Sequence, residues 1–220
     1  MPYVFGALIF GLFVPYMARR FAKFMPATFA GAVVELLRRE KKVKKYRKLE
    51  KYKKLMWRSM MYAIVAASMV WVAYGYFGSF GFGFLVSYIL ILLLLAEIDY
   101  RTFLLPDILT VPLLLLGILA SSVGMGFVAI NESVVGAVVG YFLPVMVSLF
   151  IVWYKRDAFG GGDIKLLSAL GAWLGVEGVL YVIALASVLG LIYALAKQKR
   201  SLAFGPMIAL SGIVVAIWLF

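Results

Sequence analysis

The sequence predicts an all-α, polytopic membrane protein. Of its 220 residues, 65% are hydrophobic, and the mean hydropathy is +1.03, whereas a soluble domain is roughly half apolar. The apolar residues fall into about eight runs, most of them near the ~20 residues that a helix needs to cross a bilayer. Lys and Arg gather on alternate connections between these runs, which is the charge pattern of a multi-pass protein.

The apolar runs set the predicted order of the elements. They lie at residues 3–18, 60–78, 83–98, 107–123, 133–153, 164–176, 179–196 and 203–220. The predicted organisation is a first transmembrane helix at 1–18, a basic cytoplasmic segment at 19–59 and a membrane domain at 60–220. The run from 164 is short, since about a dozen helical residues rise only ~18 Å. We expect it to cross a thinned region or to begin below the membrane surface.

The charges predict which ends lie on which side. Residues 19–58 hold fifteen Lys and Arg against three Glu, so 15 − 3 = +12, the whole net charge of the chain, falls in that segment. The connections near 79–82, 124–132 and 176–178 contain no Lys or Arg. Because cytoplasmic loops carry the excess of Lys and Arg, both chain termini are predicted to lie outside. The first run lacks a basic segment before it, so it is predicted to be an anchor rather than a secretory signal.

Two residue types are missing altogether. The chain contains no cysteine and no histidine, which excludes disulfides, thiolate nucleophiles and metal sites built on those ligands. It also excludes mechanisms that use imidazole as the base. Any catalysis must therefore come from Asp, Glu, Lys, Ser, Thr, Tyr or Arg.

Two aspartates are the candidate catalytic pair. Asp99 ends the third run and Asp163 opens the sixth, so antiparallel threading carries both to the cytoplasmic membrane level. Two carboxyl groups brought together in a partly dry site share one proton. One can then activate a water molecule while the other protonates the scissile carbonyl of a peptide. Helix capping is the plainer alternative; it suits Asp163 but not Asp99, which ends a helix.

Helix ends suggest which aspartate does which. An anion is favoured at a helix N-terminus and disfavoured at a C-terminus. We therefore predict that Asp163 acts as the base and Asp99 carries the proton, although a coupled pair titrates as a unit.

Three glycines, Gly160, Gly161 and Gly162, precede Asp163. Without side chains they allow another backbone to approach closely, so a substrate strand could pair there through main-chain hydrogen bonds. A flexible loop is the alternative.

The charged residues near the two aspartates each have more than one possible role. Asp107 follows a proline and precedes an apolar run, so helix capping is favoured over substrate contact. Glu97 is either solvated at the interface or faces the site. Lys165 either tunes Asp163 or extends its ammonium group to the surface, and the second is favoured. If the substrate is basic, an acidic cluster of Glu97, Asp107 and Asp157 would attract it.

The stretch IDYRTFLLPDILT (98–110), followed by GGGDIKLL (160–167), resembles the paired aspartate motifs of the type IV prepilin peptidases, the GxGD membrane aspartyl proteases. The motif aspartates correspond to Asp99 and Asp163, which are 163 − 99 = 64 residues apart, a separation similar to the family's. The sequence FGP at 204–206 also resembles a motif near the family's last span. The resemblance covers roughly residues 84 to 220.

The resemblance implies removal of a short basic leader from pilin-like precursors at the cytoplasmic face of the inner membrane, with no cofactor. Bacterial members commonly carry a cysteine-rich, zinc-associated cytoplasmic segment and also N-methylate the product. Residues 19–59 occupy that place without cysteine, so S-adenosylmethionine is expected as a cofactor only if the methyltransferase activity is retained.

The basic segment has three possible partners. A helix at 36–58 lying on anionic lipids is favoured, because each base near such a surface is worth ~1 kcal/mol. Docking of partner proteins is the second most favoured role of this segment, and nucleic-acid binding is the least favoured.

Two other functions compete with the protease. A proton- or cation-coupled transporter could use the same acids, but they gather at one face and no inverted repeat is evident. A non-enzymatic membrane scaffold would leave the acids unexplained.

Overall fold

The computed structural model describes residues 8–9, 11–19, 62, 82–152, 160–197 and 203–219. The chain divides into two compact units, Met1–Val72 and Ala73–Phe220. In the first unit, residues 8–9 and 11–19 are helical, within and just beyond the predicted first helix. The rest of the basic segment at 19–59, and the run at 60–78 apart from residue 62, lie outside the described residues.

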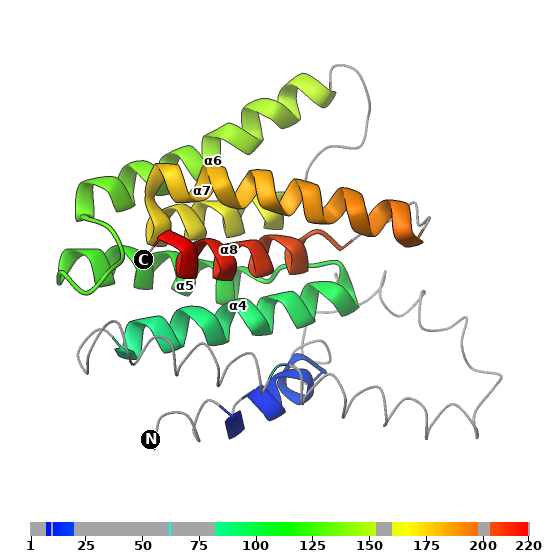
Figure 1. Ribbon diagram of the computed structural model, residues 1–220, viewed down its shortest axis with the longest axis horizontal. Coiled ribbons are helices and arrows are strands. Elements are labelled where there is room, and N and C mark those ends of the chain that lie inside the picture. Colours follow the sequence, from blue (N-terminus) through cyan, green and yellow to red (C-terminus); the bar gives the residue numbers. More distant parts are fainter. Residues whose placement is uncertain are drawn as a thin grey trace. The chain divides into compact units, whose positions relative to one another are not determined.

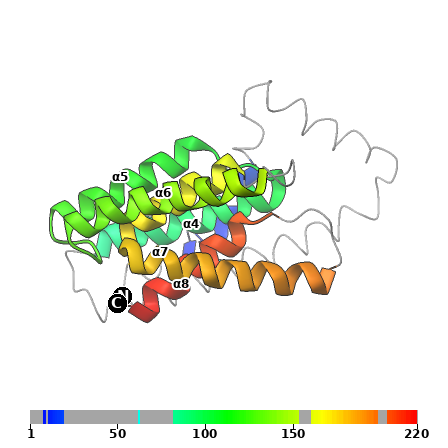
Figure 2. The same cartoon turned by 90° about the horizontal axis from the view of Figure 1, so that it is seen from above.

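The described part of the second unit contains five helices. They are α4 (Phe82–Thr102), α5 (Asp107–Ser122), α6 (Ile130–Val152), α7 (Gly161–Lys197) and α8 (Gly205–Leu219). Helix α7 packs against α5, α6 and α8, and α4 packs against α5 and α8; Figures 1 and 2 show α7 beside both α6 and α8. No strand occurs in the described ranges, so the predicted all-α class is confirmed for them.

Three of the described helices are long and apolar enough to cross a membrane, at Gly83–Thr102, Ile130–Leu149 and Gly161–Ala196. Helices α5 and α8 are shorter but also apolar. The predicted runs at 83–98, 107–123, 133–153 and 203–220 therefore each coincide with one helix. A hydropathy pattern locates such helices well because each must satisfy its own backbone hydrogen bonds in lipid.

Element α7 consists of two helices that meet at a kink and correspond to the runs predicted at 164–176 and 179–196. It is interrupted at Gly175, whose φ of 72° and ψ of −172° are not helical. A positive φ is accessible to glycine without steric cost. The break thus falls at the edge of the predicted connection near 176–178, and the prediction of two helices in this region is confirmed.

Helices α6 and α7 approach each other through small residues. A Cβ atom added to Gly171 would lie 2.1 Å from the carbonyl oxygen of Gly136, so only glycine fits at this crossing. Two buried hydroxyls reinforce it: Ser133 Oγ donates to Ala172 O at 2.6 Å, and Ser168 Oγ donates to Ala137 O at 2.9 Å. Close approach at small residues and hydroxyl hydrogen bonds are the usual means of helix association in lipid. The first half of α7, which carries Asp163 in its first turn, is therefore tightly held.

An aromatic cluster joins α4 to α7. The rings of Tyr88 and Trp173 have centroids 4.9 Å apart, and Phe127 packs against both. Their polar atoms also bond across helices: Tyr88 Oη donates to Gly212 O at 2.9 Å, and Trp173 Nε1 donates to Leu113 O at 2.8 Å. Since 99 − 88 = 11 residues is about three helical turns, Asp99 lies on the same face of α4 as Tyr88. The cluster thus orients the face of α4 that carries Asp99.

Replacing Gly171 with alanine is expected to destabilise the fold by about 1–3 kcal/mol, the usual cost of overpacking a tight contact, because the added methyl group meets backbone atoms of α6. Thermal unfolding of the purified protein in detergent measures the effect. The matched control is Gly83→Ala, whose added Cβ has no atom within 4 Å. Equal melting temperatures for the two variants would contradict the close contact.

Candidate active site

Asp99 lies in the last turn of α4 and is 5% exposed. The chain leaves the helix just after it, because Phe103 takes a positive φ of 55° while its N–H still donates to Asp99 O at 2.8 Å. The carboxylate itself accepts a hydrogen bond at Oδ2 from the backbone N–H of Gly205, 2.9 Å away. The backbone at the start of α8 thus contacts the Asp99 carboxylate directly.

Gly205 is the first residue of α8, whose opening N–H groups have no partner within the helix. A Cβ atom added there would lie 2.7 Å from Oδ2 and 2.9 Å from Cγ of Asp99. The glycine therefore allows the start of α8 to approach the carboxylate directly. Sequence analysis singled out only the FGP motif, because a residue that contributes its backbone carries no chemical signature in its side chain.

Asp163 lies in the first turn of α7 and is partly exposed. Its N–H donates to Gly160 O at 3.0 Å, which starts the helix. Asp99, at the end of α4, and Asp163, at the start of α7, lie close enough for their charges to interact. Folding thus brings the two candidate catalytic carboxyls together at one end of the unit, as the threading argument predicts; their catalytic role stays a prediction.

The predicted division of roles between the aspartates rested on helix ends alone. In the structure each aspartate lies at a helix N-terminus: Asp163 at that of its own helix, and Asp99 against that of α8 through Gly205. Both positions favour an anion. The helix-end argument therefore does not separate the base from the proton carrier.

The three glycines before Asp163 have different surroundings. A Cβ atom on Gly162 would lie 2.8 Å from Leu105 Cβ, so this glycine lets the LLPD segment pack against the start of α7. A Cβ atom on Gly160 would lie 3.1 Å from Asp163 Oδ2, whereas nothing lies within 4 Å of one on Gly161. Only Gly161 thus faces open space that another chain could enter.

Glu97 is fully buried and forms an ion pair with Arg101, one turn further along α4. It is therefore not solvated at the interface, one of its two predicted environments. Burial of a carboxylate is costly without a charged, hydrogen-bonded partner, and Arg101 supplies one. The pair leaves Glu97 inaccessible to a substrate.

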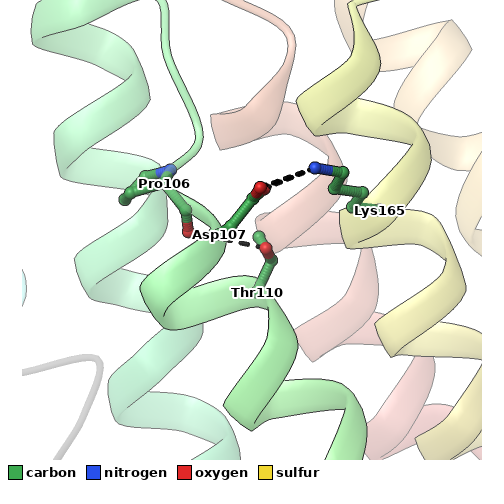
Figure 3. A network of polar contacts seen from close by, with 4 residues as sticks. All are labelled: Pro106, Asp107, Thr110 and Lys165. Atoms are coloured by element: carbon green, nitrogen blue, oxygen red, sulfur yellow. Dashed lines mark hydrogen bonds and ion pairs between the residues drawn. The ribbon is translucent and has the colours of Figure 1, made fainter.

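Asp107 and Lys165 form an ion pair that joins α5 to α7 (Figure 3). Lys165 Nζ donates to both carboxylate oxygens of Asp107 at 2.7 Å. Asp107 is not the helix cap that we predicted: Pro106 occupies the N-cap position, and no side chain caps the helix. Lys165 is likewise directed to Asp107, not simply out to the surface.

Two members of the predicted acidic cluster, Glu97 and Asp107, each form an ion pair within the chain, and attraction of a basic leader by the cluster stays a prediction. Asp157 lies outside the described residues. In the part of the chain that the structure describes, no group of three or more Asp or Glu side chains could hold a metal ion.

Comparisons with known proteins place this sequence in a family. A curated protein of Xanthomonas campestris pv. campestris, named prepilin leader peptidase/N-methyltransferase, is 38% identical over 172 residues, which are 72% of this chain and 57% of that protein. Proteins of the same name are 43% identical over 131 residues in Dickeya chrysanthemi and 38% identical over 128 residues in Neisseria gonorrhoeae, covering 54% and 56% of this chain and 44% of each relative.

The chain thus spans about half the length of the curated relatives it matches. No solved structure matches it significantly. Residues 86–195, half of the chain, match the profile of the type IV leader peptidase family. This range contains both Asp99 and Asp163. The predicted resemblance is confirmed, and the chain belongs to the type IV leader peptidase family.

Proposed function

We propose that this protein is a membrane aspartyl endopeptidase that removes the short basic leader of type IV pilin-like precursors. The observation that carries the proposal is that Asp99, at the end of α4, and Asp163, at the start of α7, lie close enough for their charges to interact and both fall within the family-matched region. Related proteins are named prepilin leader peptidases, which supports the choice of substrate. The competing transporter has no support from the family or from the fold.

The proposed reaction needs only the two carboxyl groups and water. The ionised aspartate takes a proton from a water molecule while the oxygen of that water attacks the scissile carbonyl carbon. The protonated aspartate gives its proton to the carbonyl oxygen. When the C–N bond breaks, the first aspartate returns a proton to the leaving amine and the second recovers one from the gem-diol. Both aspartates end in their starting states, so the cycle repeats without a cofactor.

This chain has no cysteine, so it does not fit the cysteine-ligated zinc site associated with the N-terminal segment of bacterial members. No step of the proposed reaction uses zinc. Methyl transfer forms part of the relatives' names, and S-adenosylmethionine would be needed here only for that second reaction. We propose the peptidase reaction alone.

The proposed setting is the inner, cytoplasmic membrane, crossed about eight times with both termini outside. The basis is the positive-inside pattern of the loops, which assigns the dyad to the cytoplasmic face. The basic residues of 36–58 would then bind anionic lipid headgroups, and no nucleic-acid partner is proposed.

Gly161 is the proposed point of backbone contact with the precursor, because its surroundings are open and Asp163 is two residues away. Gly161→Ala is expected to lower kcat/KM for leader cleavage about tenfold, near the low end of the effect of one methyl group in a binding site. Its thermal stability should be unchanged, since the methyl group meets no protein atom. Activity equal to that of the Gly83→Ala control would exclude the contact.

The function is tested with purified protein in lipid vesicles, incubated with a precursor that has a basic leader followed by an apolar helix. Mass spectrometry is expected to show one cut, at the end of the leader. Adding S-adenosylmethionine to the same reaction reads out methylation of the new amino terminus. If the Xanthomonas relative cleaves the precursor under conditions in which this protein leaves it intact, the proposed function is wrong.

A further inference from the structure

A short segment that follows Asp99 in the chain, residues 103–107, leads from the end of α4 into the first residue of α5. We call this segment the strap. The strap begins four residues after Asp99 and is tied to the end of α4: Phe103 N–H donates to Asp99 O, and Thr102 Oγ1 bonds to both Ile98 O and Leu104 O. Any movement of the strap is therefore transmitted to the turn that carries Asp99.

The strap also contacts the first turn of α7 on both sides of Asp163. Leu105 packs against Gly162, the residue just before Asp163, closely enough that a Cβ atom on Gly162 would lie 2.8 Å away. Asp107 binds Lys165, two residues after Asp163, through both carboxylate oxygens at 2.7 Å. Figure 3 shows the lysine reaching across from α7 to the start of α5. Asp163 is thus bracketed by two contacts with the same strap.

We propose that the Asp107–Lys165 ion pair is a positioning clamp that sets the separation of the two aspartates by holding the strap against α7. This inference rests on the proposed peptidase function. In this proposal Asp107 helps to set the geometry of the site and does not capture the basic leader. Its two residues are positioning residues, since neither needs to touch the substrate.

The exposure of the pair sets the size of the effect. The Lys165 and Asp107 side chains are 44% and 61% exposed, and ion pairs at such exposure contribute little to overall stability. A contribution at the upper end of that range changes the ratio of two conformations about fivefold. We therefore expect a kinetic effect of about that size with no appreciable loss of thermal stability.

The kinetic test is a double-mutant cycle on the full chain in lipid vesicles. Asp107→Asn and Lys165→Gln are each expected to lower kcat about fivefold with KM unchanged, and the double variant should be no slower than either. Lys165→Arg, which keeps the charge and presents a planar fork of donors that matches a carboxylate, should restore near wild-type kcat. A rise in KM at constant kcat, or additive losses in the double variant, would overturn the clamp in favour of direct contact with the leader.

A distance measurement tests the clamp without relying on cleavage. Because the chain has no cysteine, spin labels can be placed uniquely with Ile108→Cys on α5 and Gly161→Cys on α7, both at exposed positions. The label-to-label distance distribution is expected to be narrow with the native pair and broad after Asp107→Asn. An unchanged distribution would overturn the clamp even if cleavage is confirmed. If no precursor is cleaved, the proposed function fails and the distances alone decide the clamp.

Discussion

Replacing either Asp99 or Asp163 with asparagine is expected to abolish leader cleavage, with a loss of about 100- to 10,000-fold in kcat, the contribution of a positioned general acid or base. Asparagine has nearly the size and shape of aspartate but cannot take up or release the proton that the reaction moves. Each variant should fold, and in Asp99→Asn the amide oxygen of the new side chain can still accept the hydrogen bond that Gly205 gives to Asp99. Single-turnover cleavage of the precursor, followed by mass spectrometry, measures the loss.

The losses of activity caused by the two substitutions are not expected to add. Groups that act as one unit lose nearly all activity when either is removed, so the Asp99→Asn, Asp163→Asn double variant should be no slower than the slower single variant. Glu132→Gln is the matched control for loss of one carboxylate, since Glu132 is exposed in the first turn of α6. Substantial activity in either aspartate variant, at unchanged melting temperature, would rule out the two-carboxylate mechanism.

Gly205→Ala is expected to lower kcat about 100-fold, the scale of a 1 Å misplacement of a reacting group. The added methyl group would lie 2.7 Å from Asp99 Oδ2 and 3.0 Å from its Cβ, so either the carboxylate or the start of α8 must move. Both movements break the hydrogen bond from the Gly205 N–H. The measurement is again single-turnover cleavage, with KM determined separately to show that substrate binding is retained.

The control for this variant is Gly83→Ala, which adds the same methyl group in open space at the other end of α4. Gly205→Ala should lose far more activity than stability, because the clash is confined to one carboxylate. If Gly205→Ala cleaves as fast as Gly83→Ala, the N–H of Gly205 has no part in positioning Asp99.

Hydropathy was sufficient to predict the helices because lipid requires each one to satisfy its backbone within its own segment. The predicted runs at 107–123 and 203–220 coincide closely with α5 and α8. The same reasoning divided α7 into two helices, as the structure does. The two helices meet at a single glycine in a positive-φ conformation, Gly175, next to the connection that hydropathy predicted near 176–178.

The side-chain partners were less predictable than the helices. Asp107 was expected to cap α5 because local sequence offers a cap at that position, but Lys165, 58 residues further along, takes its carboxylate. The two environments predicted for Glu97 did not name Arg101, although it lies one turn away on the same helix. Several partners were possible for each acid, and only their distances in the folded chain select one.

The sequence by itself determined the class of protein, the approximate helices, the absence of thiol and imidazole chemistry, and the two aspartates that belong to a recognised motif. Each of these follows from composition or from residues close together in the chain. The tertiary structure alone decided that a glycine amide from α8 holds Asp99 and that Lys165 ties the strap to α7. The physical reason is that charges at a membrane face are costly unless compensated, and the compensating groups here come from helices that meet only when the chain folds.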